Sequence, residues 1–196
     1  MDKKAFEELG KRYGDVASWA IWAPELDRPK SNIGNLSVFN DPDLHEKVNP
    51  NYAFIGLNVS GARKPDATIV RWESFHSPFG KHHDYKLRYA LKDTPYWGSY
   101  ITDLIKNFPE LHSENVVSFM RRNPDVLKEN IDDFREEMAI LGHPVLVAMG
   151  GTVYDMLQKA VADSFQIVGI KHYSFTISKE NYRKELLERM STIKES

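Results

Sequence analysis

Three polar side chains stand where predicted buried strands of this 196-residue chain end. Asn58 follows an apolar run at residues 52–55, Asp103 continues a second run, and His172 comes just after a later one. In open α/β sheets the carboxyl ends of the strands meet at one edge, where ligands and catalytic groups are placed. We therefore expect these three side chains to lie close together. Their chemistry would be hydrogen bonding, because an asparagine amide both donates and accepts whereas an ionised aspartate only accepts.

Short apolar runs alternate with amphipathic helical segments along the chain. Because these runs are continuous, they are expected to be buried on both faces, as in a parallel sheet. The alternation predicts one domain over residues 1–196, of the three-layer α/β/α class with a four-stranded parallel sheet. The predicted strands are residues 52–55, 99–106, 145–149 and 165–170, and the predicted helices are residues 5–13, 16–22, 84–91, 124–141, a helix capped by Thr152 that runs to about residue 162, and one capped by Ser178.

The composition excludes several kinds of functional site. The chain has no cysteine, which excludes disulfides, thiolate nucleophiles, cysteine-bound zinc and iron–sulfur clusters. With no signal-peptide core and no apolar run long enough to span a bilayer, we expect a cytoplasmic protein without a membrane partner. The net charge of −2 gives no overall attraction to nucleic acid.

Residues 61–92 nevertheless carry seven basic side chains against three acidic ones. This excess indicates either a solvated loop and helix face or a rim that faces phosphate. The sequence His82-His83-Asp84 offers metal-ligating groups, but adjacent helical residues point apart and no third ligand is evident, so we expect no metal and no cofactor. The pair Gly150-Gly151 precedes a predicted helix without the lysine of a P-loop, and we expect it to serve helix–sheet packing.

Four segments together resemble motifs of the uracil-DNA glycosylase superfamily, nearest its mismatch-specific and single-strand-selective branches. Residues 56–61, Gly-Leu-Asn-Val-Ser-Gly, are similar to G-x-N-P-[GS], and residues 171–174, Lys-His-Tyr-Ser, to a strand followed by His-Pro-Ser. Residues 100–106 resemble the strand Tyr-(Ile/Val)-Thr-Asn-(Leu/Val)-(Val/Ile)-Lys, and residues 145–152 resemble a later strand that ends Ala-(Leu/Met)-Gly. The resemblance covers roughly residues 50–190 and keeps the order and spacing of the motifs.

The resemblance implies an enzyme that extrudes a nucleotide into a pocket and hydrolyses its N-glycosidic bond. By match, the carbonyl of Asn58 would hold the attacking water. His172 would hydrogen-bond the base as negative charge develops on it. Gly56 and Asp103 would belong to the base-binding site, where an aromatic side chain, Phe79 or alternatively Phe75, stacks on the base.

The same resemblance places a nucleic-acid contact around this site. The residues expected there are Ser60, Lys81, Lys171, Ser174 and Phe175. The expected partner is DNA, including single-stranded or damaged DNA, or a nucleobase or nucleoside, and we expect a monomer.

The chain departs from the family pattern at three positions. Val59 and Tyr173 replace the prolines of two motifs, and Asp103 replaces the asparagine that reads uracil. An ionised aspartate facing a uracil carbonyl would be left unpaired, which costs roughly 1–3 kcal/mol or more for a charge. It suits a base edge with two adjacent donors, such as that of guanine, although a protonated Asp103 would mimic asparagine. We therefore hypothesise that plain uracil is not the best substrate.

Two other functions fit the same residues. The first is a non-catalytic module of the same fold that binds a nucleobase or nucleic acid, with Asn58 serving only to stabilise a turn. The second is a flavodoxin-like phosphate or nucleotide binder that uses Gly150-Gly151. A loop position for His172 on the surface and a core position for Phe79 remain open.

Overall fold

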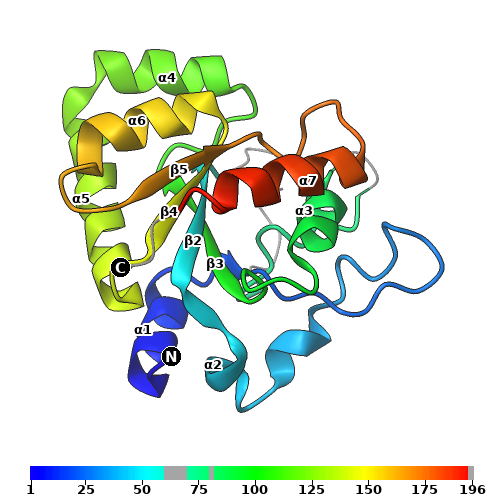
Figure 1. Cartoon of the computed structure of the whole chain (residues 1–196). Helices are drawn as coiled ribbons and strands as arrows, with labels where there is room; N and C mark the ends of the chain where they lie inside the picture. The colour runs from blue at the N-terminus through cyan, green and yellow to red at the C-terminus, as the bar shows by residue number, and fades with distance from the viewer. Residues whose placement is uncertain (60–69, 80–81, 194–196) are drawn as a thin grey trace.

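The chain folds around a sheet that has helices on both of its faces (Figure 1). The computed structural model describes residues 1–59, 70–79 and 82–193. Its strands are β1 (Ser18–Trp19), β2 (Asn49–Asn58), β3 (Ser99–Ile105), β4 (Val145–Met149) and β5 (Ile167–Ile170). Its α-helices are α1 (Lys3–Arg12), α2 (Leu44–Lys47), α3 (Asp84–Leu91), α4 (Ser113–Arg122), α5 (Pro124–Leu141), α6 (Gly151–Val161) and α7 (Lys179–Met190), and a 3-10 helix spans Leu36–Asn40.

The sheet is mixed and five-stranded, in the order β1-β3-β2-β4-β5. Strands β2 to β5 pair in parallel, whereas β1 pairs with β3 in the antiparallel sense. The α/β class is therefore confirmed, but the sheet is not the four-stranded parallel sheet that the sequence predicted.

The segment around β1 is the clearest error of the sequence analysis, which predicted a helix over residues 16–22. Ser18 and Trp19 instead pair with Ile101 and Tyr100 of β3. Trp19 is fully buried and packs edge-on against the Tyr100 ring, with ring centroids 4.9 Å apart. Burial of this indole against β3 outweighs the helical spacing of the segment, because local propensity is weak compared with tertiary packing.

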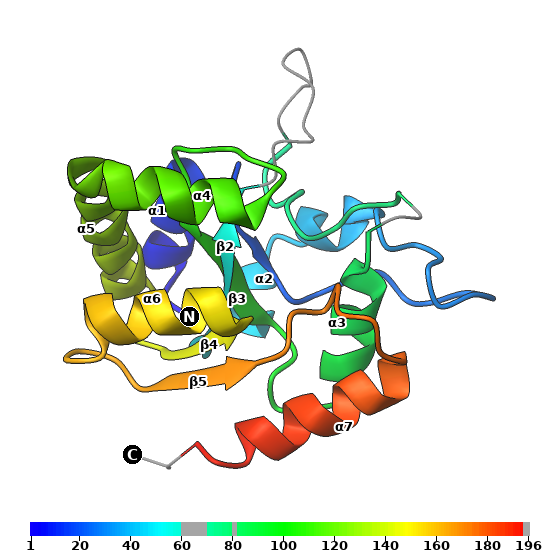
Figure 2. The same cartoon turned by 90° about the horizontal axis from the view of Figure 1, so that it is seen from above.

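Two apolar clusters cover the two faces of the sheet. Side chains of α1, α4, α5 and α6 form one cluster, and side chains of α3 and α7 form the other. Viewed from above, the sheet lies between these two groups of helices (Figure 2). Alternate residues of β2 pack into the two clusters. Ala53 and Ile55 belong to the first cluster and Phe54 to the second, because successive side chains of a strand point to opposite faces of the sheet.

Local signals place most helix ends where the sequence predicted them. Helix α5 begins at Pro124 and ends before Gly142, whose φ of 105° is left-handed. Ser178 caps α7 by accepting a hydrogen bond from the main-chain nitrogen of Asn181 at 3.2 Å. Thr152 does not cap α6, because Gly150 occupies the N-cap position. Helix α4 was not predicted.

The strand order changes direction at β2. From β2 the chain first moves to β3 on one side and then crosses to β4 on the other. In sheets of this kind, ligands bind in the crevice beside the carboxyl ends of the strands where the order reverses. Asn58 ends β2 and Gly150 follows β4, so both lie at this point of the sheet.

Candidate functional site

Gly56 makes room for the carboxyl group of Asp103. The two residues are register partners on neighbouring parallel strands, β2 and β3. A Cβ atom on Gly56 would lie only 2.1 Å from Oδ1 of Asp103, which is closer than real contacts allow. The carboxyl group therefore lies directly over the main chain of β2. The resemblance had assigned both residues to a base-binding site, and the structure brings the two together.

Asp103 is a buried acid with a perturbed pKa. Only 8% of the residue is exposed. Burial raises its pKa to about 7, and the charge of Glu137 adds to the rise, while the ammonium group of Lys106 lowers it. Among the described residues, none donates a hydrogen bond to its side chain. At neutral pH this carboxyl group is therefore divided between a form that donates and a form that only accepts.

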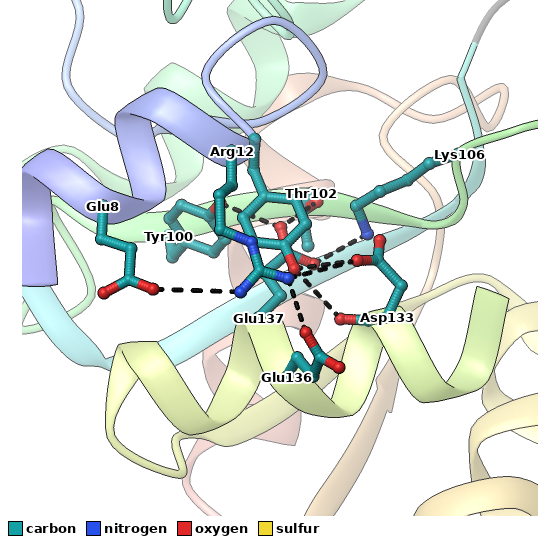
Figure 3. A network of polar contacts seen from close by, with 9 residues as sticks. Glu8, Arg12, Tyr100, Thr102, Lys106, Asp133, Glu136 and Glu137 are labelled. Atoms are coloured by element: carbon teal, nitrogen blue, oxygen red, sulfur yellow. Dashed lines mark hydrogen bonds and ion pairs between the residues drawn. The ribbon is translucent and has the colours of Figure 1, made fainter. Parts of the chain in front are cut away.

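A buried polar network joins β3 to α5 (Figure 3). Its side chains Tyr100 and Thr102 alternate with Asp103 along β3, so they face the opposite side of the sheet. Glu137 of α5 is fully buried and accepts hydrogen bonds from the hydroxyl groups of Tyr100 and Thr102, both at 2.9 Å. Lys106 forms an ion pair with Glu137 at 2.7 Å and donates to the main-chain oxygen of Asp103 at 2.6 Å. The network thus fixes the end of β3 and sets the charge environment of Asp103.

Asn58 is held by its amide nitrogen. Nδ2 donates to the main-chain oxygen of Val59 at 2.9 Å and to that of Glu110 at 2.8 Å. The bond to Val59 is the local turn contact expected of an asparagine, whereas Glu110 lies 52 residues away and belongs to the loop after β3. With both amide hydrogens used, the carbonyl oxygen Oδ1 is the side chain's remaining hydrogen-bonding group, and it can only accept.

His172 follows β5 and is half-buried. The main-chain nitrogen of Ser174 donates to Nδ1 at 3.2 Å, and the Ser174 hydroxyl lies 2.7 Å from the same atom. Nδ1 is therefore the acceptor, which leaves the proton of the neutral ring on Nε2. Burial, with a smaller contribution from the charge of His83, lowers the pKa of His172 to about 4. The ring is thus a neutral donor at physiological pH.

Tyr173 connects the His172 loop to α3, a contact that the sequence analysis missed. Its ring stacks on His172 with centroids 4.3 Å apart. Its hydroxyl is hydrogen-bonded to Asp84, which also accepts from the main-chain nitrogen of Ser77 at 2.8 Å. Burial and then the charges of Asp84 and Asp103 raise the pKa of Tyr173 well above its usual value. Tyr173 therefore shares an environment with Asp103, and its only signal in the sequence was the missing motif proline.

Phe75 and Phe79, the two candidates for the aromatic residue of the site, differ in how they pack. Phe75 packs on the α3/α7 side of the sheet, in the cluster to which Tyr173 also belongs. Its φ of 64° is left-handed, a strained conformation that bulky residues rarely adopt and that occurs at functional sites. Phe79 is 71% exposed, and its ring lies edge-on to that of His82, so it is not a core residue.

The residues expected to contact nucleic acid differ in their surroundings. Ser60 and Lys81 lie outside the described residues. Lys171 forms an ion pair with Glu185 at 2.8 Å and covers the ring of Phe175. Ser174 is exposed, and Phe175 is 53% exposed beside it.

The basic stretch at residues 61–92 is not simply a solvated face. Arg88 is buried and donates to the main-chain oxygens of Ala23, Pro29 and Ser31. Lys86 is buried as well. Two of the seven basic side chains are therefore part of the interior around α3.

The predicted helix–sheet packing does not explain why residues 150 and 151 are glycines. Gly150 adopts a φ of 111°, which favours glycine. A Cβ atom on Gly151 would meet nothing within 4 Å, so close helix–sheet packing does not require it. A Cβ atom on Gly150 would make ordinary contact with His172 at 3.8 Å, which places this loop beside the histidine.

The described part of the chain contains no group of three or more histidine, aspartate or glutamate side chains able to hold a metal ion. None of its helices is long and apolar enough to cross a membrane. Comparison of the chain with protein-family models, with curated proteins and with solved structures finds no match.

Proposed function

We propose that the chain is an N-glycosylase that hydrolyses the bond between a modified or mispaired base and its sugar in DNA, as a divergent relative of the uracil-DNA glycosylase superfamily. The hydrogen bonding of Asn58 carries the proposal. Both of its amide hydrogens are donated to main-chain oxygens, so Oδ1 is fixed in position and remains an acceptor at the carboxyl edge of the sheet. A fixed acceptor at this edge can hold a water molecule in line with the sugar carbon.

In the proposed reaction, the water oxygen forms a bond to C1′ of the sugar while the bond between C1′ and the base nitrogen breaks. The bonding electrons leave with the base, and the proton lost by the water balances that charge on the released base. Asn58 only orients the water, because an amide is not a base at neutral pH. Catalysis must then come mainly from stabilising the departing base.

His172 supplies that stabilisation. Its neutral ring offers the Nε2 proton to an oxygen or nitrogen of the base on which negative charge develops. A donor held in place by Ser174 requires little reorganisation during the reaction, which is what makes such donors effective. A ring that is already neutral also avoids the cost of charging itself.

Asp103 reads the edge of the base. In its ionised form it pairs with two adjacent donors, and in its protonated form it offers one donor and one acceptor, as asparagine does. A pKa of about 7 makes both forms accessible near neutral pH. Substrate preference is therefore expected to depend on pH, and plain uracil should be a poor substrate in mildly alkaline solution.

A glycosylase assay tests the proposal. Single- and double-stranded oligonucleotides, each with one uracil, hypoxanthine, xanthine, or alkylated or oxidised base, are incubated with the protein, and abasic sites are then cleaved by alkali. We expect release of at least one of these bases and its loss in a folded Asn58→Ala variant. Release that survives in Asn58→Ala would refute the role of Asn58.

A non-catalytic base-binding module is the other outcome of this assay. In that case no base is released, and Asn58→Ala only weakens binding of the oligonucleotide. The variant must be compared at equal folded fraction, because losing the bond to Glu110 also loosens the loop after β3.

A further inference from the structure

A second feature lies beside His172, on the α3/α7 side of the sheet. A cavity of about 430 Å³ opens between the start of α3 and the loop that precedes α7. Its lining includes His83, Lys86, Ser174, Thr176 and Ser178. No lining residue is acidic, and Ser174 also contacts Nδ1 of His172. The remaining lining residues, Tyr85, Phe175 and Ile177, are aromatic or aliphatic. The cavity therefore has polar groups beside apolar walls, carries no negative charge in its lining, and is directly connected to the candidate site.

Lys86 is a buried cation that forms no ion pair with an acidic side chain of residues 1–59, 70–79 and 82–193. Only 5% of the residue is exposed, and its ammonium group donates to the main-chain oxygen of Phe175 at 2.9 Å. Burial and the charge of Lys30 lower its pKa. The neighbouring acid, Asp84, is bonded instead to Ser77 and Tyr173. Because buried charges are costly unless they are paired, a cation in this position calls for an anion from outside the chain.

The other groups around the cavity favour an anion too. Nδ1 of His83 is buried and has no hydrogen-bond partner among the described residues. Lys30 lies over the ring of Tyr85, close enough to act on both Lys86 and His83. The 12-residue helix α7 begins at the cavity, and its N-terminus adds positive potential.

We infer that this cavity binds a phosphate group, held by Lys86, the hydroxyl of Thr176 and the start of α7, so that the substrate is a phosphorylated nucleotide and not a free nucleoside or base. The inference rests on the proposed function for the identity of the nucleotide, but the phosphate site itself does not depend on catalysis. Phosphate bound here would lie beside Ser174, whose hydroxyl group contacts Nδ1 of His172. The site would therefore position the nucleotide relative to the donor that acts on its base.

Calorimetric titration of the full chain tests the inference. The probes are inorganic phosphate, thymidine 5′-monophosphate, thymidine and a thymidine tetranucleotide. We expect the monophosphate to bind at least ten-fold more tightly than the nucleoside, and Lys86→Met to remove that preference. Lys92→Met is the matched control, because Lys92 follows the other end of α3 and is exposed.

Lys30→Met provides a second variant in case Lys86→Met does not fold. Lys30 is exposed, so its replacement should leave the fold intact and weaken monophosphate binding by about two- to five-fold, as expected for a partly screened charge. Equal affinity for monophosphate and nucleoside would overturn the inference. So would a folded Lys86→Met that keeps the full preference, or Lys30→Met that binds as tightly as Lys92→Met.

The same titrations distinguish the two sources of phosphate. If the site takes a phosphate of a single strand, the salt dependence of tetranucleotide binding should become shallower by about 0.7 in Lys86→Met. If it takes a free nucleotide, that slope should not change while monophosphate binding is lost. Base release without any phosphate preference would refute only this inference. Phosphate-dependent binding without base release would refute only the proposed function.

Discussion

Replacing Asp103 by asparagine should give a protein that recognises uracil and releases it at a rate that no longer depends on pH. Asparagine offers one donor and one acceptor at every pH, whereas Asp103 does so only when protonated. With a pKa of about 7, about one molecule in ten is protonated at pH 8 and about nine in ten at pH 6, since each pH unit changes the ratio ten-fold. Asp103→Asn should therefore release uracil about ten-fold faster than the natural chain at pH 8 and at nearly the same rate at pH 6.

The assay compares kcat/KM for a single-stranded oligonucleotide with one uracil between pH 6 and pH 8. The natural chain should lose activity as the pH rises, and the variant should show a flat profile. A flat profile for the natural chain, or identical profiles for both, would refute the assignment of Asp103 as the group that reads the base.

Stability provides a test of the same group that does not depend on activity. Between pH 3.8, the usual pKa of an aspartate, and about 7, the unfolded chain has lost a proton that the folded chain still holds. The contribution of Asp103 to the free energy of unfolding therefore falls as pH rises through this window and is constant above it. Asp103→Asn should remove this loss and stabilise the chain at pH 8 by up to about 4 kcal/mol, at about 1.4 kcal/mol for each pH unit. Urea unfolding at pH 5 and pH 8 measures the difference, and an equal effect at both pH values would contradict the buried acid.

Three further predictions follow from the same region. Gly56→Ala should displace the neighbouring carboxyl group and abolish base release, while Gly151→Ala, which meets nothing within 4 Å, should not; equal activities in the oligonucleotide assay would contradict the steric role. Lys106→Met should cost about 3–5 kcal/mol in urea unfolding because it leaves the buried carboxylate of Glu137 without its ion pair, whereas the control Lys128→Met, whose ion pair is exposed to solvent, should unfold like the natural chain. His172 should remain neutral between pH 6 and pH 8 by ¹⁵N NMR, with the proton on Nε2, because its pKa is lowered to about 4; a midpoint near 6.5 would show that the ring is solvated.

The elements with strong local signals could be predicted from sequence. Helix α5 carries a proline at its start and a glycine after its end, and β4 is a continuous apolar run, so both were found at their observed bounds. Helix α4 carries Val116, Phe119 and Met120 at helical spacing, and all three pack in the first cluster, so its period was present in the sequence and was overlooked. Strand β1 is two residues long and exists only because β3 lies beside it, which no local pattern can show.

Sequence order could predict which strands carry the candidate residues but not their chemistry. Strand ends in a parallel sheet share an edge, so Asp103 was expected near the end of β2, and it is the register partner of Gly56. The protonation of Asp103 depends on burial and on Lys106, both of which are properties of the folded chain. The bond between Tyr173 and Asp84 joins residues from distant parts of the sequence, so reading the motif alone showed only that a proline was absent.

The network behind β3 allows the site to be retuned without changing any residue that would touch the base. Lys106 and Glu137 act on Asp103 with opposite sign from the far face of the sheet. A substitution that weakens the lysine contribution would favour the protonated acid, and one that neutralises the glutamate would favour the ionised form. Base preference could therefore diverge between descendants of this chain through changes in a layer of the protein that no substrate reaches. Such drift would be invisible to any comparison restricted to the residues around the ligand.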